Sequence, residues 1–294
     1  MATYTNLDDE IISQSALESF VKILAPFRAF STNFSAAPGT RGANVLVPLV
    51  SGLTATTFGG SYAVSGGTKS VVTISLSQHK IVHIGQDDIT AANSSAASLE
   101  SFGRQQGAAL ALLVLQDVLS LVTTANFSLA TAVASTAMDV PQLRKARLDL
   151  NQNDVPVEPR AMLIDCTPYD ALLGVTNFVQ AHMFRDNNVL ADGKVMRAAG
   201  FDFHELNNLF ASGASVMAFA AHPNAIAVAM RYLQPQDPSA YESAYAVTDP
   251  ETGITLGLRK HYDANTGTRY LNMECNYGYS KGLTTAGRVI KRTD

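Results

Sequence analysis

The chain has 294 residues, of which 47% are hydrophobic and only 16% are charged, and its formal net charge is −4. Typical soluble proteins carry about 25% charged residues, so this composition favours a surface that is largely buried against other copies of the chain. The negative net charge excludes the broad basic field that gripping DNA or RNA requires. The two cysteines do not form a disulfide framework, which indicates a reducing cytosolic origin. The acidic run 8–10 is unlike a secretory leader, so we expect no targeting segment.

The first forty residues are expected to form a helix followed by an extended arm. Asn6 or Asp8 can cap the helix, and Pro26 ends it. Its apolar face recurs at helical spacing and comprises Leu7, Ile11, Ile12, Ala16, Leu17, Phe20, Val21 and Leu24. Residues 25–40 show no firm period. They are predicted to lie as an extended arm over another surface, or to pack on their own domain.

Residues 41–90 are predicted to form a two-stranded flap. Strand-like runs at 44–50 and 72–77 flank a stretch rich in glycine, serine and threonine, and Pro48 confines the first strand to an edge. A further short strand is expected at 80–84. Because an isolated two-stranded ribbon is only marginally stable in water, the flap must pack on its own body or on a neighbouring molecule. The residues leave both options open.

Residues 94–124 are predicted to form a helix of about 45 Å, at 1.5 Å per residue. The predicted buried face comprises Leu99, Phe102, Gln106, Leu110, Leu113, Asp117, Val118 and Leu121. Residues 108–115 are apolar on every side and are expected to be covered all round, although the polar pair 116–117 makes the apolar run too short to span a membrane. Gly103 and Gly107 have the small-xxx-small spacing that lets another backbone approach closely.

The rest of the chain is predicted to mix helices and strands, after an irregular stretch at 126–138. Asp139 and Gln142 form a capping-box pair for a helix whose apolar side is Val140, Leu143, Ala146 (or the stem of Arg147) and Leu150. Thr167 is expected to cap a short helix, with Pro168 at its first position and its end near Gly174. A further helix is predicted at 224–232, and residues 178–196 are left as loop or short helix. Strands are predicted at 161–164, 200–206, 215–221, 254–259, 271–277 and 288–291, with a turn at 263–267.

No combination of residues in the sequence forms a coherent catalytic or metal-binding site. The glycine-rich run 66–70 places threonine before lysine, unlike a P-loop, and the common hydrolase, zinc, calcium and dinucleotide motifs are absent. His79 and His83 fall about 13 Å apart along a strand, too far to chelate one ion. Cys166 precedes a predicted helix, a position that can activate a thiol, but a buried structural cysteine is the other interpretation. We therefore expect no catalytic, cofactor-binding or metal-binding residue, no cofactor and no enzyme activity.

Several segments nevertheless resemble one family in the same order along nearly the whole chain. Leu143–Asp149 followed by Asn153–Ile164 resembles the "xARxxL…xVPxxxRxxVxxP" stretch of tailed-bacteriophage major capsid proteins of the HK97 fold. Further segments resemble this family's "G-x-V…GF-x-V" stretch, its "xAFHxxAIxxA" segment and its closing strands, namely Asp192–Val195 with Ala199–Phe201, Met217–Ile226 and Gly253–Gly278.

The resemblance implies an α+β fold, the HK97-like capsid fold, in five parts. These are an N-terminal arm (1–40), an extended β-flap or E-loop (41–80), a first part of the P-domain with a long spine helix (81–164), an A-domain (165–255) and the closing strands of the P-domain (256–294). The arm and the E-loop would reach across neighbouring subunits, and the A-domain would cluster at five- and six-fold axes.

The function that the resemblance implies is that of a major capsid protein, a structural virion protein that self-assembles as pentamers and hexamers into an icosahedral shell around packaged phage double-stranded DNA. Assembly would take place in the host cytoplasm with a separate scaffolding protein and a portal, with non-specific DNA contact and no membrane. Some relatives join subunits through a lysine–asparagine bond. Lys69 and Asn276 are the required residue types, but no motif fixes them, and this chemistry is not carried over.

Two alternatives remain open from the residues. An encapsulin-like compartment protein shares the fold and encloses enzyme cargo. A soluble α/β enzyme with a site near Cys166 and Thr167 belongs to a different class.

Overall fold

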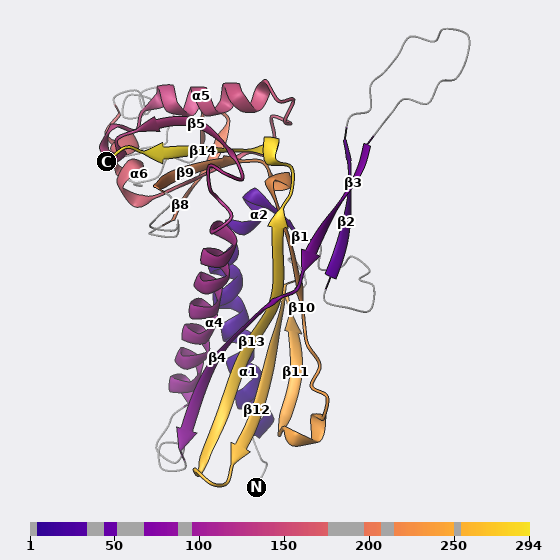
Figure 1. The fold of residues 1–294 in the computed structure, drawn as a ribbon. Coiled ribbons are helices and arrows are strands. Elements are labelled where there is room, and N and C mark those ends of the chain that lie inside the picture. Colours follow the sequence, from indigo (N-terminus) through magenta and orange to yellow (C-terminus); the bar gives the residue numbers. More distant parts are fainter. Residues whose placement is uncertain are drawn as a thin grey trace, which may run out of the picture.

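The computed structural model describes residues 5–33, 44–51, 68–87, 96–175, 197–206, 215–249 and 254–294. They form an elongated lower unit, an upper unit at one end of it and a flap that projects to the side (Figure 1).

The lower unit is a six-stranded sheet with two long helices along it, α1 (Thr5–Leu24) and α4 (Ala96–Leu119). The strand order is β1-β10-β13-β12-β11, and β4 pairs antiparallel with β13 as well. The sheet is antiparallel except that β1 runs parallel to β10. Its strands are β1 (Ser31–Asn33), β4 (Gln78–Asp87), β10 (Ile226–Arg231), β11 (Ser243–Thr248), β12 (Thr255–Asp263) and β13 (Thr268–Lys281).

The upper unit is a second six-stranded sheet in the order β5-β14-β9-β6-β8-β7, accompanied by α5 (Val140–Asn151) and α6 (Cys166–Leu173). The short 3-10 turns Pro223–Ala225 and Thr284–Ala286 lie where β9 continues into β10 and β13 into β14, so two consecutive-strand connections join the sheets. Its strands are β5 (Ser128–Val133), β6 (Ala161–Ile164), β7 (Arg197–Ala198), β8 (Phe201–Glu205), β9 (Val216–Ala221) and β14 (Gly287–Arg292).

Two glycines bring α1 and α4 into backbone contact. A Cβ atom added at Gly107 would lie 2.1 Å from the carbonyl oxygen of Ala16, and one at Gly103 would lie 2.6 Å from the carbonyl oxygen of Ile12. Both distances are far below van der Waals contact, so only glycine permits this approach. The small-residue spacing predicted from the sequence is confirmed.

The buried face of α4 differs from the predicted one. Gln106, Leu110 and Val118 are buried, but Phe102 and Leu112 are 45% and 43% exposed. The expected cover all round residues 108–115 is therefore wrong for the single subunit. A segment that is apolar on every side carries no pattern to mark its inner face, and this chain leaves the outer face uncovered.

Two stretches form strands that the sequence did not predict as such. Residues 126–138 contain β5, whose mixture of small, polar and aliphatic side chains gives a weak alternation and whose partner, the parallel strand β14, is distant in sequence. Residues 224–232 form β10 instead of a helix, because Ile226–Met230 is buried on both faces and a continuous apolar run suits either element. The strand β11 was not predicted.

Two helix boundaries also differ. α6 begins at Cys166, since the Asp165 carboxylate accepts the Cys166 N–H at 2.9 Å and takes the capping role expected of Thr167. Part of the expected extended arm forms α2 (Phe27–Phe30) and β1, with both phenylalanines buried in the chain's own body. Residues 34–40 and the stretch 178–196 lie outside the described residues.

The other predicted elements are confirmed within a few residues at their ends. α1, α5, β6, β8, β9, β12, β13 and β14 stand where expected, and the Asp139–Gln142 capping box is formed in both directions. Gly267 adopts a positive φ of 60° in the predicted turn between β12 and β13.

The histidines of the upper unit make stability depend on pH. His222 is 7% exposed and its Nδ1 accepts the Asn224 N–H at 3.3 Å; burial, with the charge of Arg160, lowers its pKa below the usual 6.5. Burial also lowers the pKa of His204. Below pH 6.5 the unfolded chain then binds more protons than the folded one, so the free energy of unfolding falls as the pH falls. Denaturant unfolding should have a lower midpoint at pH 5.5 than at pH 7.5.

The matched variant for this effect is His222→Asn, which keeps an oxygen that can cap the following turn. It should reduce the midpoint difference between the two pH values. If the double variant His204→Asn/His222→Asn shows the same difference in unfolding midpoint between pH 5.5 and pH 7.5 as the original chain, neither histidine causes the pH dependence.

Candidate assembly surfaces

The flap has one buried and one exposed face. β2 (Asn44–Ser51) and β3 (Thr68–Ser75) pair antiparallel over their full length as a separate two-stranded sheet, so Pro48 lies on an edge strand as predicted. The inner side chains pack against Ala227 and Ala229 of β10; they are Val45, Val47 and Ile74. Of the outer side chains, Leu46 and Val71 are 50% and 52% exposed. The root of the flap thus rests on its own body, while its outer face is exposed and carries Leu46 and Val71 among the polar side chains of Asn44, Thr73 and Ser75.

β3 ends in direct backbone contact with β13. A Cβ atom added at Gly278 would lie 2.2 Å from the carbonyl oxygen of Ser75, the last residue of β3. The chain then turns, with the Ser77 N–H donating to the same oxygen at 2.9 Å, and continues as β4 along β13. This contact sets where the flap leaves the body.

Alanine at Gly278 is expected to push the end of β3 away from β13, because the obstructing atom belongs to the backbone and has no rotamer to change. Overpacking of this kind costs about 1–3 kcal/mol. Denaturant unfolding should show that loss, and amide hydrogen exchange should accelerate in β2 and β3. Gly174→Ala is the control, since its nearest Cβ contact is an ordinary 3.5 Å. Equal exchange rates in both variants would contradict this role of Gly278.

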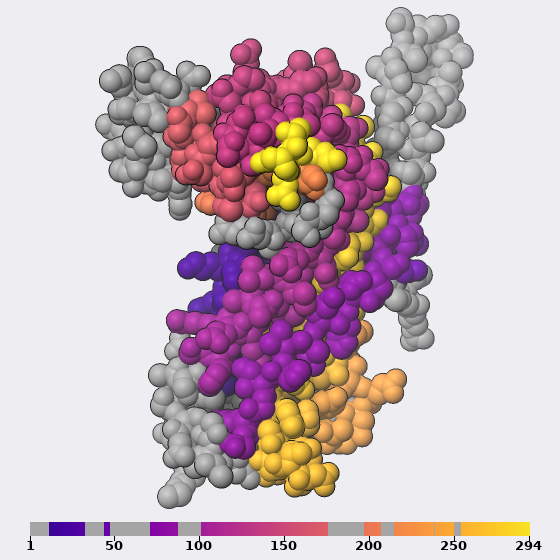
Figure 2. Space-filling model, turned by 60° about the vertical axis from the view of Figure 1, so that its left-hand side comes forward, coloured from indigo at the N-terminus to yellow at the C-terminus, as the bar shows by residue number. Residues whose placement is uncertain are grey.

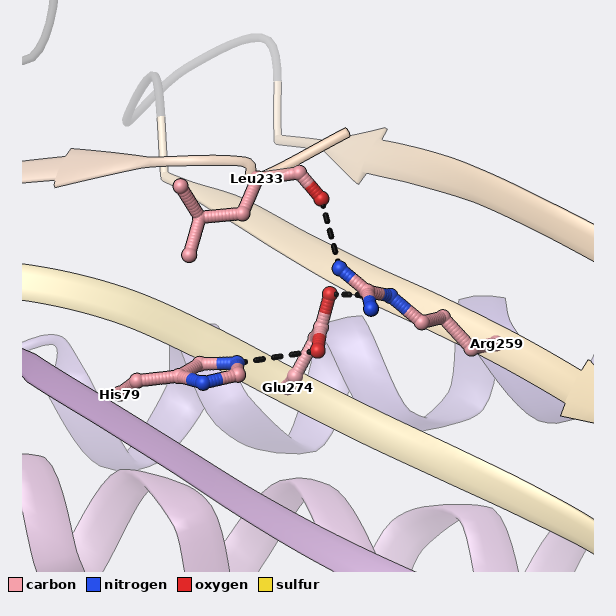
Figure 3. Close-up of polar contacts among 4 residues, drawn as sticks. All are labelled: His79, Leu233, Arg259 and Glu274. Atoms are coloured by element: carbon pink, nitrogen blue, oxygen red, sulfur yellow. Dashed lines mark hydrogen bonds and ion pairs between the residues drawn. The ribbon is translucent and has the colours of Figure 1, made fainter. Parts of the chain in front are cut away.

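A buried carboxylate joins three strands at the same root (Figure 3). The Glu274 side chain on β13 is 4% exposed, and its Oε1 lies 2.8 Å from Arg259 Nε on β12, an ion pair without hydrogen-bond alignment. Its Oε2 lies 3.0 Å from His79 Nε2 on β4. Arg259 also donates to the Leu233 carbonyl oxygen at 2.8 Å. Because His79 follows the flap by only a few residues, this cluster fixes the junction between flap and body.

The long helix α4 is attached to the sheet through its two polar interruptions. Gln106 Nε2 donates to the Leu271 carbonyl oxygen at 3.1 Å. Asp117 Oδ2 accepts the Tyr277 hydroxyl at 2.5 Å and lies 3.1 Å from Lys80 Nζ. Burial, followed by the bond to Asp117, raises the pKa of Tyr277, so its hydroxyl remains a donor. These bonds hold α4 to both β13 and β4, which lie beside it in Figure 2.

Large apolar side chains are exposed over several elements. They include Leu46 and Val71 on the flap, Ile81 on β4, Phe102 and Leu112 on α4, Leu129 on β5 and Leu148 on α5. Apolar surface distributed in this way is suited to burial by neighbouring molecules.

The residues considered for other chemistry lie apart from one another. His79 and His83 occupy exposed positions of β4, and no cluster of three metal-ligating side chains occurs among the described residues. The half-buried Cys166 has its Sγ 4.0 Å from the Thr167 hydroxyl, which is not a base, so this geometry gives no support to the enzyme alternative. Asn276 is buried in β13, whereas the side chain of Lys69 lies outside the described part. Within the described residues, no helix has both the length and the hydrophobicity to cross a membrane.

Residues 105–239 match the model of a family described as phage capsid protein. No curated protein matches the chain. Its fold is similar to the capsid structure of the cyanophage P-SCSP1u, with a TM-score of 0.65 and 15% identity over 91% of this chain and 88% of that one. It is also similar to the mature capsid of bacteriophage PhiM1 (TM-score 0.59, 12% identity, 91% and 87% covered) and to Gordonia phage Cozz (0.59, 13%, 92% and 86%).

The shared fold defines the structural class: the chain has an α+β fold like that of phage capsid proteins, in agreement with the HK97-like fold predicted from the sequence, and residues 105–239 are similar to the phage capsid protein family. The fold predicted from the sequence is confirmed, the match over residues 105–239 agrees with the predicted family and function, and the alternatives are not favoured.

Proposed function

We propose that this chain is a tailed-phage major capsid protein and that the flap is the element through which each subunit grips its neighbour in an icosahedral shell of pentamers and hexamers. The observation that carries this proposal is the two-faced flap. Val45, Val47 and Ile74 anchor its root to the chain's own body, whereas Leu46 and Val71 stay half exposed on the other face. A neighbouring subunit that covers this outer face would supply the packing that a two-stranded ribbon lacks.

The five-part division of the chain is consistent with this proposed assembly of subunits. The flap corresponds to the E-loop (41–80), the lower unit with α4 to the P-domain, and the upper unit to the A-domain at the symmetry axes. β5 and β6 precede residue 165 yet lie in the upper sheet, beside α5, and β10 and β11 precede residue 256 yet lie in the lower one. We therefore propose that the division follows the two sheets more closely than the boundaries at 164 and 255. The N-terminal arm (1–40) would add contacts between subunits.

The partners in this proposal are a separate scaffolding protein, a portal and packaged double-stranded DNA, with assembly in the host cytoplasm. A net charge of −4 suits a wall that touches DNA non-specifically without holding it. Many weak contacts per subunit suffice for a stable shell, because they act together.

Deleting residues 52–67 tests the role of the flap. The variant should fold, with an unchanged circular dichroism spectrum, and should fail to form the shells of tens of nanometres expected of the intact chain in negative-stain electron microscopy. If the intact chain stays small alone, the candidate scaffolding protein is added to both samples. A second variant replaces residues 52–67 with a glycine–serine segment of equal length. It shows whether assembly requires only the length of this segment or also its amino-acid sequence. Normal shells from the deletion variant, or its unfolding, would refute the proposed role.

A further inference from the structure

The outer side of α5 presents a cationic hollow of about 440 Å³. The described residues that line it are Pro141, Arg144, Lys145, Arg147, Leu148 and Asn151. Lys145 is paired with Asp149 at 2.7 Å. Arg144 and Arg147 are exposed, and neither forms a hydrogen bond or an ion pair with another described residue. Leu148 lies beside them on the helix and is 50% exposed. Two guanidinium groups that no described residue neutralises, around an exposed leucine, make a surface for an acidic, partly apolar partner.

Acidic side chains occupy the opposite end of the same sheet. Glu205 is the last residue of β8 and pairs with Ile164, the last residue of β6, after which the chain enters α6 with Asp170. Glu205 and Asp170 are both exposed and form no ion pair with another described residue. Lys291 and Arg292 end β14 at this side, but β9 and β6 separate them from β8.

The two charged surfaces lie at the two ends of one strand. A Cβ atom added at Gly200, immediately before β8, would lie 3.8 Å from the Arg147 guanidinium, whereas Glu205 ends that strand. At about 3.3 Å per residue, β8 separates the cationic and the acidic surface by roughly 15 Å. Each subunit thus carries complementary charges at opposite ends of its upper unit, which is the arrangement of a contact between unlike surfaces that repeats from copy to copy.

We propose that neighbouring copies meet head to tail, with the cationic α5 surface (Arg144, Arg147 and Leu148) of one copy against the acidic end (Asp170 and Glu205) of the next. This inference rests on the proposed shell and names the surfaces of one of its contacts. A second copy is the occupant because this same chain supplies the matching charges. The exposed leucine and the negative net charge of the chain favour a protein surface over a nucleic acid.

Charge reversal on each surface tests the contact. The variants Arg144→Glu/Arg147→Glu and Asp170→Lys/Glu205→Lys place like charges opposite one another, which costs several kcal/mol per contact and should raise the concentration needed for assembly at least about tenfold. An equimolar mixture of the two variants, or the chain that carries all four changes, restores opposite charges and should restore assembly. Failure of both rescues in folded protein, or normal assembly by either variant alone, would overturn the inference.

The control for net charge is Lys22→Glu/Lys281→Glu, which alters two exposed lysines of the lower unit by the same amount and should assemble normally. Normal assembly of this control shows that position, and not total charge, decides the result. Loss of assembly in this control as severe as in the cationic variant would contradict the assignment to α5.

Cross-linking tests the contact without requiring shells. In a Cys166→Ser background, subunits with Leu148→Cys and subunits with Thr167→Cys keep all four charges. Cys275 does not interfere, because burial raises its pKa to about 12. When the Leu148→Cys and Thr167→Cys subunits are mixed at assembly concentration and oxidised, they should form a disulfide-linked heterodimer. Thr167→Cys subunits alone should not form a disulfide-linked dimer. Shells without the heterodimer would refute the head-to-tail contact, whereas the heterodimer without shells would refute the proposed shell alone.

Discussion

Replacing Gly107 with alanine is expected to separate α1 from α4 and to destabilise the subunit by about 2 kcal/mol, although alanine is the better helix former by about 1 kcal/mol. The added methyl group would lie 2.1 Å from the Ala16 carbonyl oxygen, 2.9 Å from its carbonyl carbon and 3.0 Å from its Cα. All three atoms belong to the backbone of α1, so the whole helix must move. That movement opens the packing of Ile12, Phe20 and Leu24, which are all buried.

Denaturant unfolding measures the loss, and hydrogen exchange should show that it is concentrated in α1. The control is Gln105→Ala on the exposed side of α4, where the added alanine gives only a small gain in helix propensity and meets no neighbour. Ala16→Gly should not rescue the variant, because it removes a side chain and leaves the obstructing carbonyl in place. A Gly107→Ala subunit as stable as the original would mean that α1 can shift at little cost.

Elements that the sequence predicted well carry their own local signals. The Asp139–Gln142 capping box, the Asp263–Gly267 turn and the alternation in β12 and β13 depend on residues close in the chain. β5 and β10 depend instead on partners far away, β14 and β13 respectively. Their weak alternation or continuous apolar runs leave the choice between strand and helix to tertiary pairing. The predictions failed where that pairing decided the structure.

The same contrast between local sequence signals and long-range packing holds for the assembly surfaces. The sequence marked Gln106 and Asp117 as polar interruptions of the long helix, and both bind the sheet. It also marked Gly103 and Gly107 as sites of close approach. Glu274 and Asn276 alternate with apolar residues along β13, a pattern typical of a half-exposed strand, yet both are buried. The flap root and the chain after β10 cover that face, and no local pattern announces this cover.

The buried ion pair at the flap root leads to the second large effect. Glu274→Ala is expected to lower the free energy of unfolding by about 3 kcal/mol, because it leaves the Arg259 guanidinium, with a side chain only 16% exposed, without its counter-ion. The Leu233 carbonyl and the Tyr241 ring, 5.5 Å from the guanidinium carbon, remain as partners and do not replace the carboxylate. His79 also loses its bond, so hydrogen exchange should accelerate at the start of β4.

Two variants separate the causes of that loss. Glu274→Gln keeps the volume and an acceptor oxygen but removes the charge, so its loss should be smaller than that of alanine. Glu242→Ala breaks the pair with Arg269 on the same sheet, where both side chains are about 40% exposed, and should cost less than about 1 kcal/mol. Equal losses from Glu242→Ala and Glu274→Ala would show that burial does not strengthen the pair. The free energy of unfolding should fall far more in Glu274→Ala than in Glu242→Ala. If Glu274→Ala also impairs assembly under conditions where the subunit is folded, this carboxylate determines the position of the flap.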